Sequence, residues 1–209
     1  LLVAVEPGEL MVTEIMMNPT SVSDSAGEWI ETQLLASGPR TNPWMQEASS
    51  RKIQAGDLVA YDTDLVGAYG MMCDISRTFV AGNTQPTAQQ SNLHSIASEM
   101  VATNTQLLTP GRSFRELTFE SMVPDVDQFR HYSCLFHGVG QCDEYPNISL
   151  PAAWEQFGYD GVIEPGMVFT VESFVARRDG GEGVKLEIQT LITEDGAERL
   201  DFSPLDLAF

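Results

Sequence analysis

The clearest periodicity in the chain is helical and lies between Pro86 and Leu108. Apolar residues recur there every three or four positions, at Leu93, Ile96, Met100, Val101 and Leu107. This spacing places them on one face of a helix. Thr87, followed three residues later by Gln90, has the pattern of a helix cap, and Pro110-Gly111 ends the segment. The pattern therefore predicts an amphipathic helix that packs against a core.

Two shorter helices are also predicted. Ser113 and Glu116 have the spacing of a capping box, and the helix that they begin is expected to run to about Val123, before Pro124. Near the start of the chain, Glu9 to Met17 is predicted to be helical, and Pro19 ends it.

Segments rich in β-branched and aromatic residues alternate with these helices. Such segments favour strands, and Gly67 and Gly70 within one of them indicate the turn of a hairpin. The predicted strands lie in Glu28 to Ala36, the hairpin Leu58 to Val80, Tyr132 to Gly140, Val162 to Val175 and Val184 to Thr193. A chain of 209 residues is long enough for one sizeable domain.

Three aspartates interrupt the predicted hairpin. Asp62 and Asp64 are two residues apart, so an extended strand projects both side chains from one face. The turn brings Asp74 roughly opposite them, within a residue of register. Three carboxylates this close are costly unless a cation lies between them. They indicate either a divalent-metal site or a solvated, exposed hairpin face.

Further polar residues lie within apolar strands. Glu172 and Glu187 each interrupt an apolar run, and His137 precedes two glycines at the end of another. Buried glutamates need partners. An oxygen-rich set with one imidazole suits a pair of Mn, Fe, Co or Zn ions.

His94, in the long helix, has no acidic neighbours in sequence and is interpreted as a surface or packing residue. Trp44 and Met45 either cover a pocket or pack as ordinary apolar side chains.

The amino-acid composition limits the classes of molecule that the protein is expected to bind. The chain has 11 basic and 30 acidic residues and a formal net charge of -19, which argues against binding to nucleic acid or to an anionic membrane. The acidity either favours cationic ligands or only maintains solubility.

The three cysteines form no Cys-x-x-Cys pair, and no signal peptide or long apolar segment is recognised. We expect a soluble, cytoplasmic protein. Because the chain lacks an initiator Met, we also expect a fragment of a longer protein.

The order Asp, Asp, His, Glu, Glu, together with the turn Glu164-Pro165-Gly166-Met167 before Thr170-x-Glu172, resembles the pita-bread metallohydrolases, the superfamily of methionine aminopeptidase, prolidase and creatinase. Two features depart from the peptidases. Thr63 occupies the place of their first aspartate, eleven residues before the second, and no histidine follows His137-Gly138-Val139-Gly140.

Both departures match the P-type dimethylsulfoniopropionate (DMSP) lyases of marine bacteria. The segments AYDTDLVGAYGMMCDISRTF, EWIETQLLASGPRTNPW and FHGVGQCDEYP resemble that family throughout. The resemblance implies an α+β pita-bread fold, in which residues 1–209 form the C-terminal catalytic domain and the family's N-terminal domain is absent. It also implies β-elimination of DMSP to dimethyl sulfide and acrylate, and a homodimer.

The resemblance also assigns roles to residues. Asp143 would be the general base and Tyr132 a pocket residue near the sulfonium. Two metal ions, iron in the family, with manganese, cobalt or zinc as alternatives, would be held by Asp62, Asp64, Asp74, His137, Glu172 and Glu187. Two other functions stay open: an Xaa-Pro aminopeptidase-like dinuclear hydrolase, and a catalytically silent binding module with the same fold.

Overall fold

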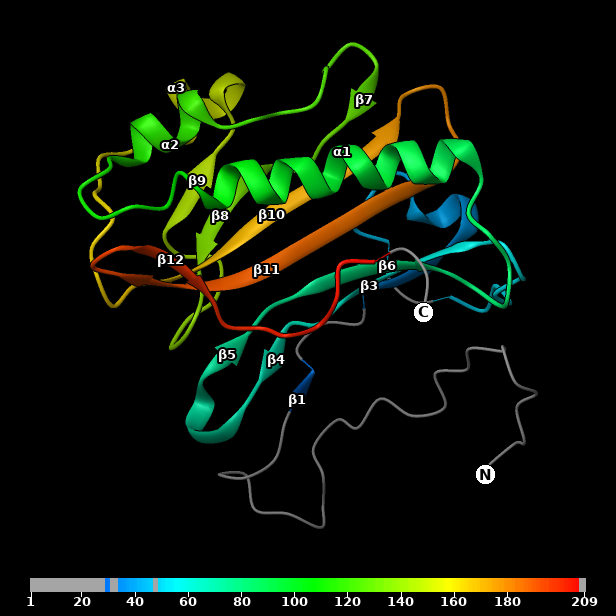
Figure 1. The fold of residues 1–209 in the computed structure, drawn as a ribbon, viewed down its shortest axis with the longest axis horizontal. Helices are drawn as coiled ribbons and strands as arrows, with labels where there is room; N and C mark the ends of the chain where they lie inside the picture. Colours follow the sequence, from blue (N-terminus) through cyan, green and yellow to red (C-terminus); the bar gives the residue numbers. More distant parts are fainter. Residues whose placement is uncertain (1–28, 31–33, 47–48, 207–209) are drawn as a thin grey trace.

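The computed structural model describes residues 29–30, 34–46 and 49–206 (Figure 1). The helix predicted for Glu9 to Met17 lies outside these ranges, as do residues 28 and 31–33 of the strand predicted for Glu28 to Ala36. Within them, the strands form three antiparallel sheets.

The largest sheet supplies nearly half of the buried residues of the main core. Its two long strands, β10 and β11, pair along most of their length. Its strands, in spatial order, are β12 (Gly196–Arg199), β11 (Gly183–Thr193), β10 (Val168–Arg177), β8 (Cys134–Gly138) and β9 (Asn147–Ser149), and β7 (Phe129–Arg130) also pairs with β10.

The predicted hairpin spans two small sheets. One contains β2 (Leu35–Ser37), β3 (Leu58–Asp62) and β6 (Ser76–Val80), and the other contains β1 (Trp29–Ile30), β4 (Leu65–Val66) and β5 (Met72–Cys73). Asp62 pairs with Ser76, and Leu65 pairs with Cys73 in the same register. That register places Asp64 opposite Asp74, as the sequence predicted.

Both predicted capping boxes form. Helix α1 (Ala88–Thr105) begins at the Thr87–Gln90 box and α2 (Phe114–Glu120) at the Ser113–Glu116 box. The other helices in the described part of the chain are α3 (Trp154–Phe157) and the 3-10 turns Gly38–Thr41, Ala68–Gly70 and Pro151–Ala153.

Helix α2 ends three residues before the predicted Val123. The side chain of Asn104, on α1, accepts a hydrogen bond from the Met122 amide at 2.8 Å and donates one to the Met122 carbonyl at 3.1 Å. Because both backbone groups of Met122 are bonded to α1, they cannot continue the hydrogen-bond ladder of α2.

Strands β10 and β11 are buried on both faces. Helix α1 covers one face, where Phe169, Val171 and Leu186 contribute to the main core (Figure 1). Strands β3 and β6 lie against β11 on the other side. Since side chains alternate between faces, Glu172 and Glu187 point toward β3 and β6 rather than into the apolar core. Within the described ranges, none of the helices combines the length and apolar character needed to span a membrane.

Candidate metal centre

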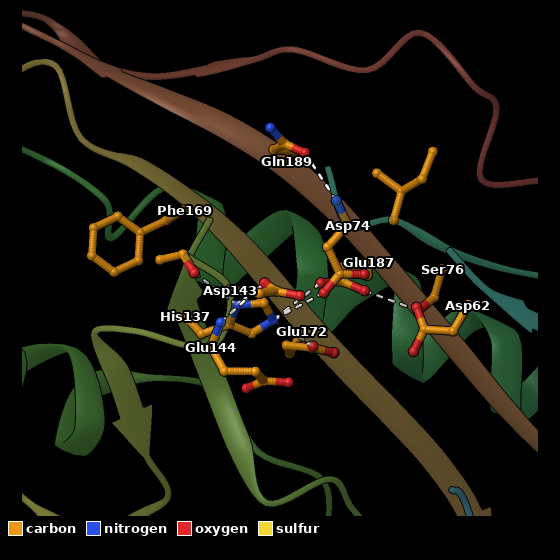
Figure 2. Close-up of polar contacts among 12 residues, drawn as sticks. Asp62, Asp74, Ser76, His137, Asp143, Glu144, Phe169, Glu172, Glu187 and Gln189 are labelled. Atoms are coloured by element: carbon orange, nitrogen blue, oxygen red, sulfur yellow. Dashed lines mark hydrogen bonds and ion pairs between the residues drawn. The ribbon is translucent and has the colours of Figure 1, made fainter. Parts of the chain in front are cut away.

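Four buried side chains from four neighbouring segments form one group. Asp74, His137, Glu172 and Glu187 each offer an atom within 4.8 Å of the others. The Nε2 atom of His137 lies 3.3 Å from Asp74 Oδ2, 3.2 Å from Glu172 Oε1 and 3.5 Å from Glu187 Oε1. Figure 2 shows these carboxylates converging on the imidazole ring. The sheet explains the convergence. Glu172 on β10 pairs with Glu187 on β11, and His137 on β8 pairs with Thr170, two residues before Glu172 on β10.

A second group shares Asp74 with the first. Asp64, Asp74 and Asp143 also offer atoms within 4.8 Å of one another. Asp143 lies in the loop after β8, and its Oδ1 is 3.6 Å from Nδ1 of His137. Asp74 therefore joins the two groups.

Asp62 belongs to neither group. Its Oδ1 accepts a hydrogen bond from Ser76 Oγ, its partner across β3 and β6, and its Oδ2 lies 3.6 Å from Lys185 Nζ. Figure 2 shows Asp62 beside Ser76 and away from the His137 ring. Five of the six predicted ligands therefore lie in the two groups, and Asp143 joins the second. The ligand roles of all six stay a prediction.

Burial and mutual repulsion dominate the electrostatics of these acids. Burial, together with the charge of Glu187, raises the pKa of Asp74 to about 10. Burial raises the pKa of Glu172 to about 7 and that of Asp62 to about 6. For Glu187 burial acts the same way, but Lys185 and His137 outweigh it and lower the pKa below the ordinary range. Closely spaced, buried carboxylates of this kind are stabilised by added positive charge.

Buried polar atoms that lack a hydrogen-bond partner indicate which kind of cation this group of side chains can bind. Among the described residues, Asp74 Oδ1, His137 Nε2 and Glu187 Oε1 are buried without a hydrogen-bond partner. Buried polar atoms rarely lack partners unless an ion or water supplies one. Several carboxylate oxygens around one imidazole nitrogen are a donor set for borderline divalent metals. The side chains present therefore fit a divalent-metal centre.

Sequence reasoning missed Lys185, which is 1% exposed. Its ammonium group lies 2.6 Å from Glu172 Oε2 and 3.2 Å from Glu187 Oε2, and it donates a hydrogen bond of 2.8 Å to Ser76. The signal was present in the sequence, because Lys185 precedes Glu187 by two residues on β11 and so shares its face.

A cavity of about 420 Å³ opens beside the second group. Asp64, Asp143 and Tyr132 line it, as does Met45. Trp44 is not among its lining residues. Trp44 is buried, packs on Phe174 with ring centroids 5.9 Å apart and lies over Lys185 Nζ.

Two further observations concern Asp143 and His94. Burial raises the pKa of Asp143 to about 6, although the charge of His137 opposes the shift. His94 lies outside both groups on α1, where its ring contacts the Leu205 carbonyl, so it packs the C-terminal segment against the helix.

The model of metallopeptidase family M24 matches residues 6–194. This chain belongs to metallopeptidase family M24. Among solved M24 structures, a prolidase from Pyrococcus furiosus superposes with a TM-score of 0.67 at 32% identity, over 82% of this chain and 49% of that chain. The predicted α+β pita-bread fold is thereby confirmed.

Two curated relatives are more similar in sequence. The dimethylsulfoniopropionate lyase DddP of Roseobacter denitrificans is 45% identical over 183 residues, which cover 87% of this chain and 41% of the relative. The lyase DddP of Roseovarius nubinhibens is 46% identical over the same shares. The predicted resemblance to the DMSP lyases is confirmed. This M24 chain spans less than half the length of these relatives.

Proposed function

We propose that this chain is the metal-binding part of a lyase that cleaves DMSP by β-elimination into dimethyl sulfide and acrylate. The observation that carries the proposal is the place of Asp143. Its carboxylate lines the cavity, belongs to the group with Asp64 and Asp74, and contacts His137. The 45% identity to a DMSP lyase supports the same substrate, against 32% to the prolidase.

The reaction requires removal of a proton from the carbon next to a carboxylate. Asp143 would accept this proton as general base. It lines the cavity, and its elevated pKa makes it a stronger base than an ordinary aspartate, which supports this role. The sulfonium is already a good leaving group, so its departure needs no acid.

The two groups would hold two divalent ions: Asp74, His137, Glu172 and Glu187 one ion, and Asp64 with Asp74 the other, with Asp62 as the remaining predicted ligand. When bound, such ions would supply Lewis-acid stabilisation of the negative charge that builds up on the substrate carboxylate. The protein's own task is to keep these side chains convergent and to exclude bulk water with the apolar wall of the cavity, which consists of Leu34, Met45, Met72 and Tyr132.

Tyr132 is proposed to form part of this wall near the sulfonium. Its ring lines the cavity, and the ring also lies 5.1 Å from Lys185 Nζ. A tyrosine ring attracts cations through its face, so the side turned to the cavity is the one available to the substrate.

Iron as the native metal, a homodimeric assembly and a cytoplasmic location are part of the same proposal. The metal and the assembly rest on the resemblance. The cytoplasmic location is supported by Cys73, Cys134 and Cys142, which form no disulfide and so agree with a reducing compartment.

Headspace detection of dimethyl sulfide from purified protein incubated with DMSP and Fe(II) tests the function. Acrylate should appear in equal amount. An Xaa-Pro dipeptidase-like activity is the second candidate, favoured by the likeness to the prolidase. Release of amino acids from Xaa-Pro dipeptides without dimethyl sulfide would overturn the lyase proposal in its favour.

A further inference from the structure

Lys185 is a fully buried cation that the proposed reaction does not use. Burial of an unpaired ammonium group is strongly unfavourable, so its neighbours must compensate. Four polar atoms do so: Glu172 Oε2 at 2.6 Å, Ser76 Oγ at 2.8 Å, Glu187 Oε2 at 3.2 Å and Asp62 Oδ2 at 3.6 Å.

The two glutamates divide their oxygens between two cationic partners. In both Glu172 and Glu187, Oε2 faces Lys185 Nζ, whereas Oε1 faces Nε2 of His137. A carboxylate with one oxygen fixed cannot rotate freely about its last bond. The contacts of Lys185 therefore determine where the second oxygen points.

The backbone and the aromatic neighbours fix the position of Lys185 itself. Thr78, on β6, accepts a hydrogen bond from the Lys185 amide at 3.0 Å and donates one to its carbonyl at 2.8 Å. The rings of Trp44 and Tyr132 lie 5.4 and 5.1 Å from Nζ, distances at which aromatic faces attract a cation. The ammonium group thus lies between an aromatic wall and the carboxylates.

We propose that Lys185 is a positioning residue of the metal centre, whose ammonium group fixes one oxygen of Glu172 and of Glu187 so that the other stays directed at the ion-binding side, with Asp62 as its third counter-charge. This inference rests on the metal centre of the proposed function. Groups that orient metal ligands without touching the metal commonly contribute 10–100-fold to metal affinity.

The chain provides a matched control, because it contains two lysines and the other, Lys52, is exposed. Lys185→Met keeps the length of the side chain and removes the charge. We expect at least about a 10-fold weaker Mn(II) affinity by titration calorimetry, and a changed visible spectrum of the Co(II)-loaded protein. Lys52→Met should match the wild type in both measurements, and Lys185→Arg, which keeps the charge, should recover part of the loss.

Wild-type affinity and spectrum in Lys185→Met would overturn the inference, as would an equal loss in Lys185→Met and Lys185→Arg. A second measurement needs no variant at Lys185. In Lys52→Met, isotope-labelled lysine gives NMR signals from Lys185 alone, and these should shift when Zn(II) is added. Unmoved signals in a metal-loaded sample would contradict the positioning role.

These results are distinguishable from failure of the proposed function. A protein that binds metal through a Lys185-dependent site but releases no dimethyl sulfide contradicts only the lyase. A wild type that binds no metal contradicts the metal centre. A wild type that binds metal, with a Lys185→Met variant of equal metal affinity and equal Co(II) spectrum, contradicts only the role of Lys185.

Discussion

Glu172 and Glu187 are directly opposed across strands β10 and β11, and both carboxylates are buried. Like charges opposed across a sheet destabilise it unless a cation intervenes. Here His137 lies on one side of the pair and Lys185 on the other. The long central hairpin of the fold therefore depends on the same positive charges that organise the candidate site.

Replacing Glu172 by Gln tests the first group. The amide keeps the volume of the side chain but removes a charge, so we expect metal affinity to fall by about 100-fold or more and the metal content of the purified protein to fall with it. Elemental analysis measures the content. Glu198→Gln, an exposed position on β12, is the control and should bind metal like the wild type. Full loading of Glu172→Gln would show that Glu172 is not a ligand.

Asp143→Asn separates metal binding from proton transfer. The amide cannot accept the proton, so dimethyl sulfide release should fall by about 100-fold or more, while metal content stays at the wild-type level. Glu144→Gln is the matched control, because Glu144 is the next acid in the same loop and also lines the cavity. Retained turnover in Asp143→Asn together with loss in Glu144→Gln would transfer the base role to Glu144.

Much of the fold could be predicted because its signals are local. The capping boxes at Thr87 and Ser113 need only four adjacent residues, and both form as predicted. The end of α2 could not be predicted, because it depends on Asn104, which lies on another helix and bonds Met122. The position of Asp64 opposite Asp74 could be predicted, because the turn between them sets the register of the hairpin.

The site was harder to predict where its contacts are distant in sequence. The strand pattern identified Glu172 and Glu187 as inward-facing acids, but it gave no partner for Lys185, whose contacts come from β3, β6 and β10. The orientation of Asp62 also depends on contacts that are distant in sequence, so it could not be predicted. Spacing places it on the face of Asp64, whereas its hydrogen bond with Ser76 turns it toward Lys185.

A substitution at Gly138 tests whether the loop that carries Asp143 must lie against β8. A Cβ atom at Gly138 would lie 2.3 Å from the Tyr145 carbonyl oxygen and 2.5 Å from Pro146 Cδ. Because backbone must move to relieve this contact, Gly138→Ala should displace the loop that contains Asp143. We expect dimethyl sulfide release to fall by at least about 10-fold and the protein to lose about 1–3 kcal/mol of stability. Unchanged turnover and an unchanged denaturation midpoint would contradict the close packing.

An ion pair far from the metal centre gives a pH-dependent prediction. Arg51 donates hydrogen bonds to both carboxylate oxygens of Asp57, at 2.6 and 3.0 Å, and the Gln54 amide donates a third at 2.7 Å. Burial alone would raise the pKa of Asp57, but these hydrogen bonds outweigh it and hold the pKa below its ordinary value of 3.8. The carboxylate therefore stabilises the folded state only while it is ionised.

Asp57→Asn should lower the free energy of unfolding by about 1–2 kcal/mol at pH 7. Because the folded pKa is depressed, the difference from the wild type should be constant above the ordinary pKa and should shrink as the pH falls through 3.8 and below. Urea unfolding of both proteins between pH 7 and pH 3 measures this difference. The other acids titrate in both proteins, so their contribution cancels. Arg51→Met should remove the same pH-dependent part. A difference that does not change with pH would mean that the charge of Asp57 contributes nothing and that only the hydrogen-bond geometry matters.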